Sequence, residues 1–297
     1  MTEVIGMTYE KIYYSLWETA QRYSSFCQFR VIGSSHDDRM IPMVELGEGT
    51  DGVFCLSGVN GREDTAPVFL VNMVKEYCQA YECGWQMDGF YEVRGLLDKL
   101  RLCVIPLLNP DGYEITHNGF SAIRNPIFRQ MLRMQSIPSE EYGFNARGMD
   151  ISGNFPTAHY TRQRLGQEPA SENETRALIR IFQEYGGRGL LSFCQTGREI
   201  VYYHGEQGIL GNQKSYRLAR HMQKRSAYHL EKDQAQEPQQ AKNRHIGTPE
   251  QYYMQTAKQP AFRIRMPVAD PENAKERKRA YEDIHLLPLE YIFSLVN

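Results

Sequence analysis

The chain has 297 residues, a length that fits one large domain or two ordinary ones. Hydrophobic residues make up 41% and charged residues 24%, which is typical of a globular protein and excludes a disordered, collagen-like or coiled-coil chain. Its 34 Lys and Arg residues nearly balance 36 Asp and Glu residues, so no basic excess indicates a nucleic-acid partner.

The hydrophobic runs are too short for a membrane span. The longest, residues 102–108, has about seven residues against the ~20 that a bilayer requires. The N-terminal segment MTEVIGMTYEK has no basic start and no apolar core, so it does not resemble a signal peptide. We therefore expect a cytoplasmic protein without membrane contact. Six cysteines at irregular spacing predict reduced thiols rather than disulfides.

Hydrophobic periodicity predicts helices and strands in alternation. Helices are expected at residues 8–23, 64–83, 171–185, 213–226 and 273–295, with short helices in the loop-rich segment 117–156. Strands are expected at residues 29–33, 43–47, 53–59, 102–107, 189–194, 199–203 and 260–266. Ser171 and Glu174 have the spacing of a capping box, Asn109-Pro110-Asp111-Gly112 predicts a turn, and the polar segment 231–244 predicts an exposed loop.

This alternation predicts one α/β domain over residues 1–297. The sheet is expected to be mixed, mostly parallel and twisted, with helices on both faces. Ligand sites of such sheets lie at the carboxyl ends of the strands. The loops after Val59, Leu107 and Cys194, together with the end of strand 260–266, are therefore the expected site.

Five segments at these positions resemble, in order, motifs of the zinc metallocarboxypeptidase (carboxypeptidase A) family. They are FCLSGVNGRED (54–64), IPLLNPDGYEITH (105–117), NARGMDISGNFP (145–156), SFCQTGREIVYY (192–203) and PAFRIRM (260–266). The resemblance covers nearly the whole chain and is nearest to the bacterial branch that includes γ-D-glutamyl diamino-acid peptidases. It implies a metallocarboxypeptidase/phosphorylase-hydrolase-like fold. It also implies a mechanism in which zinc, held by two His and one Glu, activates water for a glutamate base.

The residues at the family's catalytic positions depart from that pattern. The two histidine positions hold Asn60 and Cys194, whereas Glu63 keeps the carboxylate. The position of the general base falls on Arg265, which stays protonated and cannot accept a proton. A guanidinium would also repel a nearby dication. We therefore expect no metal, and expect Arg263 or Arg265 to form an ion pair with Glu63 instead.

The positions that bind the substrate's carboxylate in the family have changed too. The usual Asn-Arg pair is replaced by Ser152 and Gly153. Arg62 matches an arginine that orients substrate carbonyls, and Arg147 is expected near the pocket. The family's mobile tyrosine position falls near Lys242. Asp150 is expected to fix its own loop by hydrogen bonds.

These changes favour a degenerate, non-catalytic homologue without a cofactor. Its former active-site cleft would bind a peptide, a cell-wall fragment or another anionic ligand, and its expected lining residues are Arg62, Glu63, Arg147, Cys194, Arg263 and Arg265.

Two alternatives remain open. One is an active zinc peptidase with a rebuilt site that uses Glu63, Cys194 and a histidine from elsewhere, whose position the spacing does not identify. His117 and His204 are near the expected site in sequence order. The other is a hydrolase with Cys194 as nucleophile, which would need a histidine partner.

Overall fold

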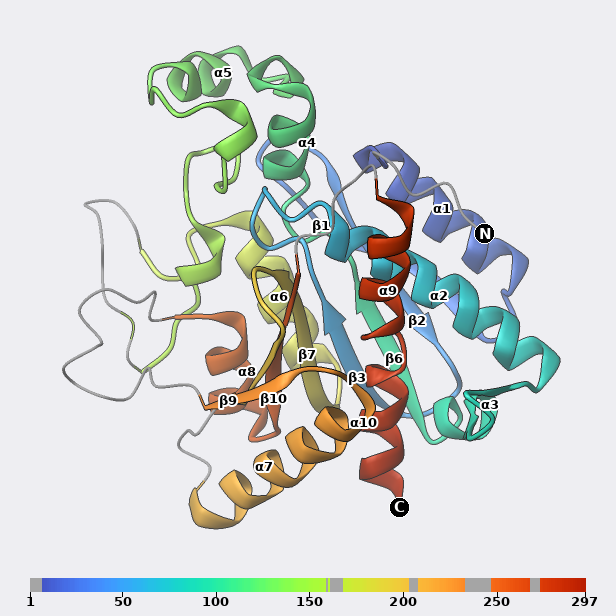
Figure 1. Cartoon of the computed structure of the whole chain (residues 1–297). Coiled ribbons are helices and arrows are strands. Elements are labelled where there is room, and N and C mark those ends of the chain that lie inside the picture. Colours follow the sequence, from blue (N-terminus) through green and yellow to red (C-terminus); the bar gives the residue numbers. More distant parts are fainter. Residues whose placement is uncertain (1–6, 159, 161–167, 203–207, 233–246, 268–272) are drawn as a thin grey trace.

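The computed structural model describes residues 7–158, 160, 168–202, 208–232, 247–267 and 273–297. An eight-stranded sheet runs through the molecule in the order β1-β2-β6-β3-β7-β10-β8-β9 (Figure 1). Its strands are β1 (Cys27–Ser34), β2 (Met40–Leu46), β3 (Asp51–Leu56), β6 (Leu100–Ile105), β7 (Gly187–Gln195), β8 (Glu199–Tyr202), β9 (His229–Lys232) and β10 (Ala261–Met266). A separate hairpin joins β4 (Gln86–Met87) to β5 (Tyr91–Glu92).

The sheet is mixed and mostly parallel, as predicted. Strand β3 pairs in parallel with β6 and β7, β7 with β10, and β8 with β9. The antiparallel pairs are β1 with β2, β2 with β6, and β10 with β8. Because β3, β7 and β10 are parallel neighbours, their carboxyl ends meet at one edge of the sheet.

Helices cover both faces, which confirms the predicted fold class. They are α1 (Tyr9–Arg22), α2 (Thr65–Cys83), α3 (Val93–Leu97), α4 (Pro110–Asn118), α5 (Pro126–Arg133), α6 (Asn173–Glu184), α7 (Gly208–Arg225), α8 (Pro249–Ala257), α9 (Ala274–Glu282) and α10 (Leu287–Val296). Alternate side chains of β3 divide between two cores. Val53 and Cys55 pack with α1, α2 and α10, whereas Phe54 and Leu56 pack with α6 and α8.

Three local predictions are corrected by the structure. Asn109 does not start an isolated turn; it caps α4, and its side chain accepts a hydrogen bond from the Gly112 N–H (2.9 Å). Ser171 does not cap α6, which begins two residues later, and its hydroxyl donates to Glu172 Oε1 (2.7 Å). The expected closing helix is two helices, with Pro288 in the first turn of α10.

The segment that precedes α8, and α8 itself, also differ from the prediction. Residues 231 and 232 belong to β9, and residues 233–246, with Lys242, lie outside the described residues. Helix α8 was not predicted, although Thr248 and Gln251 form the capping box that starts it. None of the helices in the described residues is long and apolar enough to cross a membrane.

Candidate functional site

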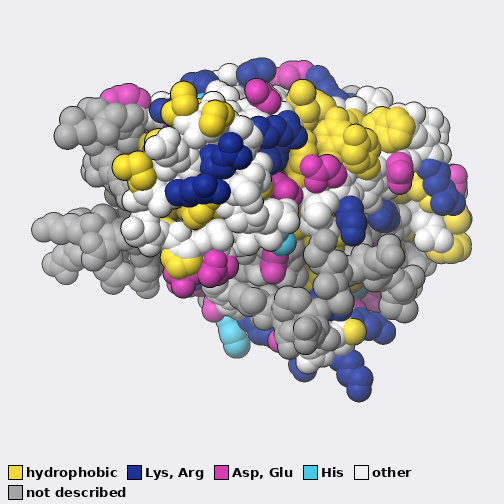
Figure 2. All heavy atoms as spheres, turned by 90° about the horizontal axis from the view of Figure 1, so that it is seen from above, with side chains coloured by type: hydrophobic (Ala, Val, Ile, Leu, Met, Phe, Trp, Pro, Cys, Tyr) yellow, Lys and Arg dark blue, Asp and Glu magenta, His cyan; other side chains and the backbone are white. Residues whose placement is uncertain are grey.

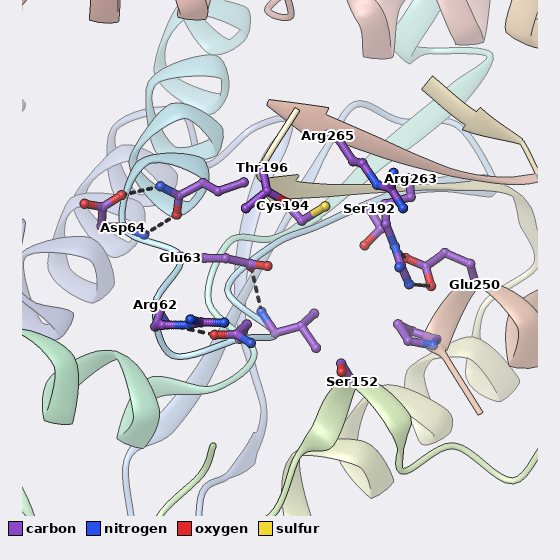
Figure 3. A pocket seen from close by; sticks show the side chains of 14 residues that line it. Arg62, Glu63, Asp64, Ser152, Ser192, Cys194, Thr196, Glu250, Arg263 and Arg265 are labelled. Carbon is purple, nitrogen blue, oxygen red and sulfur yellow. Dashed lines mark hydrogen bonds and ion pairs between the residues drawn. The ribbon is translucent and has the colours of Figure 1, made fainter. Parts of the chain in front are cut away.

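A pocket of about 690 Å³ lies at the carboxyl ends of β3, β7 and β10 (Figure 3). Its lining residues are Val59, Asn60, Arg62, Glu63, Asp64, Ser152, Ser192, Cys194, Gln195, Thr196, Pro249, Glu250, Arg263 and Arg265. The parallel strands therefore bring together Asn60, Arg62, Glu63, Cys194, Arg263 and Arg265 of the residues named from sequence.

The turn after β3 fixes Asn60 and Glu63. The Asn60 side-chain oxygen accepts a hydrogen bond from the Arg62 N–H (3.0 Å), and the Asn60 carbonyl accepts one from the Glu63 N–H (3.0 Å). Gly61 lies so close to the backbone of Gly112 that a Cβ would come within 2.7 Å of it. The turn thus needs glycine at this position, and it holds the Asn60 oxygen against the backbone.

The Glu63 carboxyl group is buried in the wall of the pocket. One of its oxygens accepts a hydrogen bond from the Val59 N–H (3.1 Å). Burial raises the pKa of Glu63 to about 8, although the Val59 N–H and the charge of Arg263 act in the opposite direction. In the absence of a metal ion, this side chain is mostly a neutral acid at pH 7.

The two arginines of β10 alternate with buried apolar residues, so both face the pocket. Arg263 forms a two-pronged ion pair with Glu250 of α8, through Nε (3.0 Å) and Nη2 (2.7 Å). Glu250 is 1% exposed. Burial raises its pKa, but the Arg263 guanidinium more than compensates and leaves the pKa below its ordinary value. Arg265 Nη1 lies 2.7 Å from Glu231 Oε2 of β9.

The expected ion pair of Glu63 is therefore wrong. Among the described residues, Arg263 pairs with Glu250 and Arg265 with Glu231, and neither forms an ion pair with Glu63. The reason is geometric: α8 and β9 bring carboxylates to the two arginines, whereas the Glu63 carboxyl group bonds the backbone of its own turn.

Cys194 lies at the end of β7 and lines the pocket with Ser192. Burial raises the pKa of the Cys194 thiol to about 12, so it is not a thiolate at neutral pH. No histidine lines the pocket within the part of the chain that the structure describes. His117 stacks on Tyr113 and its Nδ1 contacts the Tyr113 carbonyl (2.8 Å), whereas His204 lies outside the described residues.

The turn after Cys194 has a strained backbone. Thr196 has φ 94°, in the region that favours glycine. The Met266 carbonyl at the end of β10 holds the turn by accepting hydrogen bonds from the N–H groups of Thr196 (2.8 Å) and Gly197 (3.1 Å). Gln195 crosses to Asp64, with which it exchanges two hydrogen bonds of 2.7 Å. Such strain, held by neighbouring contacts, is found preferentially at functional sites.

Other expected positions fall in different places. Arg147 pairs with Glu172 (3.3 Å) and does not line the described pocket. Of the two positions that replace the family's Asn-Arg pair, Ser152 lines the pocket. Asp150 accepts hydrogen bonds from the N–H and hydroxyl of Ser152, so it fixes its own loop.

Sequence reasoning missed Ser192 and Glu250 as pocket residues. Ser192 could have been found, because it precedes Cys194 by two positions on the same strand and shares its face. Glu250 carries no local signal, because its role depends on a contact with a strand 13 residues away.

The topology and the position of the pocket define a carboxypeptidase-like α/β fold. The structure matches that of bovine thrombin-activatable fibrinolysis inhibitor in complex with tick carboxypeptidase inhibitor, with a TM-score of 0.73 and 15% identity. The match covers 98% of this chain and 97% of that chain. At this identity the likeness concerns the fold alone.

Residues 12–275 match the family model described as zinc carboxypeptidase, and the chain belongs to this family. It is 30% identical over 154 residues to the uncharacterized protein YqgT of Bacillus subtilis. This alignment covers 47% of this chain and 40% of that protein. It is 21% identical over 255 residues to γ-D-glutamyl-L-diamino acid endopeptidase 1 of Lysinibacillus sphaericus. This second alignment covers 81% of this chain and 61% of that protein. The chain thus spans less than two thirds of the length of these relatives.

The residues that the sequence resemblance places at the family's zinc positions do not suit zinc. They offer an amide oxygen, a carboxyl group and a partly exposed thiol, where the resemblance implies two histidines and a glutamate. The amide oxygen of Asn60 and one oxygen of Glu63 already accept backbone hydrogen bonds. Three guanidinium groups, those of Arg62, Arg263 and Arg265, line the same pocket and would repel a dication. We therefore derive no catalytic step through zinc.

Proposed function

We propose that this protein is a non-catalytic member of the zinc carboxypeptidase family. It uses the pocket to bind a peptide or another ligand that carries a carboxylate or similar anionic group. The observation that carries the proposal is the joint replacement at one pocket of the zinc donors and the base by Asn60, Cys194 and Arg265.

Among the described lining residues, the group at the expected position of the base does not fit the task of activating water. Arg265 is a permanent cation and cannot take a proton. The alternative of a cysteine hydrolase finds no support, because Cys194 is a protonated thiol and no described histidine lines the pocket. What remains is a set of hydrogen-bond donors around a hollow of ligand size.

Two arginines of the pocket, Arg62 and Arg265, are placed to bind an anionic group of a ligand. Arg62 is exposed at its rim, and Arg265 is one-third exposed in a pair with Glu231, which is 38% exposed. Because an ion pair this exposed is worth about 0–1 kcal/mol, a ligand carboxylate can replace Glu231 at little cost. Arg263 is engaged with a fully buried partner and is expected to stay with it.

The described surface around the pocket carries charges of both signs. Figure 2 looks down on the end of the molecule where β3, β7 and β10 end, and it shows acidic and basic side chains interspersed. With a formal net charge of −2, no long-range attraction of anions is expected. The side chains of the pocket itself must select the ligand.

Hydrolysis assays test the loss of catalysis. Peptides with a free C-terminal carboxylate and γ-D-glutamyl diamino-acid peptides are incubated with the purified protein and added zinc. We expect no cleavage above a control without protein. Zinc-dependent turnover that disappears in Glu63→Ala would overturn the proposal and support the rebuilt-site peptidase instead.

Calorimetry tests the binding. The same peptides are compared with their C-terminal amides, and the free acids are expected to bind more tightly. Arg62→Ala should weaken binding of the acid about ten- to a hundredfold, because a charge-assisted hydrogen bond contributes about 1.5–3 kcal/mol. Arg133→Ala, an exposed arginine of α5, is the matched control and should have no effect. Equal affinity for acid and amide would contradict the anionic ligand.

A further inference from the structure

A second polar cluster lies outside the lining of the pocket. His36, in the turn between β1 and β2, meets Glu172 and Glu174 at the start of α6. One ligand atom from each side chain lies within 4.8 Å of the other two. Among the described residues, this is the one group of three or more His, Cys, Asp or Glu side chains so arranged.

Glu172 holds the centre of the cluster. Its Oε1 accepts a hydrogen bond from the Ser171 hydroxyl (2.7 Å) and contacts Arg147 Nη1 (3.3 Å). Its Oε2 lies 3.1 Å from His36 Nε2 and accepts a hydrogen bond from Asn145 Nδ2 (2.7 Å). The Arg147 guanidinium thus contacts one carboxylate oxygen of Glu172, and the His36 imidazole contacts the other.

Glu174 supplies an independent observation. Its side chain is fully buried, and its Oε1 has no hydrogen-bond partner within the described part of the chain. The other oxygen accepts a long hydrogen bond from Asn145 Nδ2 (3.3 Å). A buried carboxylate oxygen without a partner is costly, so this atom calls for a cation or a donor that the neighbouring residues do not supply.

The charges around the cluster lead to the same conclusion. Four carboxylates, those of Asp37, Asp111, Glu172 and Glu174, are buried together near this turn. The guanidinium groups paired with them are those of Arg39 and Arg147. These two cations pair with Asp37, Asp111 and Glu172, whereas Glu174 has no ion-pair partner among the described residues. Buried carboxylates are normally paired or bound to metal ions.

We propose that His36, Glu172 and Glu174 bind one divalent transition-metal ion. An imidazole with two carboxylates is a donor set that suits zinc or manganese. His36 Nε2 lies 3.1 Å from Glu172 Oε2 and accepts only a long hydrogen bond from the Asn173 N–H (3.4 Å), which it would exchange for the ion. The separation of 3.1 Å is close to the roughly 3.3 Å between neighbouring donors on tetrahedral bonds of about 2.0–2.1 Å. His36 is partly exposed, which gives the ion a way in.

The ion would join three segments that are distant in sequence. These are the β1–β2 turn, the start of α6 and, through Asn145, the loop that leads to Ser152 in the pocket wall. Its role is therefore structural, and it does not depend on the function proposed for the pocket.

Zinc titration of the metal-free protein is the test. Protein stripped with a chelator is loaded with Zn²⁺, passed through a desalting column and analysed for metal, and the affinity is measured by calorimetry. We expect about one zinc per chain and a raised melting temperature. His36→Gln and Glu174→Gln should each weaken zinc binding at least tenfold. His221→Gln, a half-exposed histidine of α7, is the matched control.

Variants of the pocket separate this proposal from the previous one. Glu63→Gln and Cys194→Ser should retain zinc if the ion is at the second cluster. If zinc is lost in these two variants and kept in His36→Gln and Glu174→Gln, both proposals are wrong, because the pocket holds the metal. If wild-type protein retains no zinc, only the second-cluster proposal is wrong. If Glu174→Gln fails to fold, His36→Gln still tests the proposal. His36 is partly exposed, so replacing it should not prevent folding.

Discussion

The pocket and the β1–β2 turn both gather arginines and carboxylates, but they use them differently. In the turn, Arg39 pairs with Asp37 and Asp111 at 2.8 Å, and all three side chains are at least 96% buried. The Asp37 carboxylate also accepts hydrogen bonds from the Arg124 and Asn125 N–H groups (2.8 and 2.9 Å).

In the pocket, the two ion pairs of β10 differ in how exposed the acidic partner is. The Arg263 partner is buried, whereas the Arg265 partner is more than one-third exposed. The comparison indicates that charges bonded on several sides and sealed from water hold the loops in place. Charges with one exposed partner remain available to a ligand.

The largest effect is expected where the turn is disrupted. Arg39→Ala leaves Asp37 and Asp111 buried without their cation, which should cost about 3–5 kcal/mol of unfolding free energy. Urea unfolding at pH 7 measures it. Lys278→Ala, which breaks an exposed pair with Glu282, should cost about 0.5 kcal/mol or less. Similar losses in the two variants would remove the distinction between the regions.

The next effect concerns Glu63 and depends on pH. The folded protein keeps the Glu63 proton up to about pH 8, whereas the unfolded chain releases it near the ordinary pKa of 4.5. The stability that this proton contributes is therefore complete below pH 4.5 and is lost as the pH rises through 8. Glu63→Gln stays neutral, so it should gain about 2–4 kcal/mol relative to the wild type between pH 5 and 8.

Urea unfolding of chelator-treated wild type and Glu63→Gln at the two pH values measures this gain. A difference between the two proteins that does not change with pH would show that the carboxyl group is ionised throughout.

The smallest effects on stability are expected when either of the two arginines of β10 is replaced. Arg263→Ala leaves Glu250 buried and unpaired, and should cost about 1–3 kcal/mol. Arg265→Ala exposes Glu231 further to water and should cost about 0–1 kcal/mol. Thermal unfolding of both variants makes the comparison. Equal costs would mean that Arg265 is as firmly held as Arg263 and is not available to a ligand.

Much of the fold could be predicted from the sequence because its signals are local. The alternation of apolar residues located the strands, and the motifs around Asn60, Asn109 and Cys194 indicated the family that the family model then confirmed. The expectation that Asn60 and Cys194 stand at the family's two histidine positions also rests on the sequence alone. Parallel strand pairing then explains why these residues share one pocket.

The partners of the charged side chains were not predictable in this way. Arg263 bonds Glu250 of α8, a helix that was not predicted although its capping box is present in the sequence. Arg265 bonds Glu231 of β9, a strand whose polar sequence predicted a loop. Arg147 and His36 meet on Glu172, although His36 is more than a hundred residues away in sequence.

The sequence by itself thus determined the family and most of the order of the elements, because both follow from residue type and local spacing. The tertiary structure alone decided which carboxylates are neutralised, which are buried and which stay without a partner. These properties depend on burial and on distances between segments that only folding brings together.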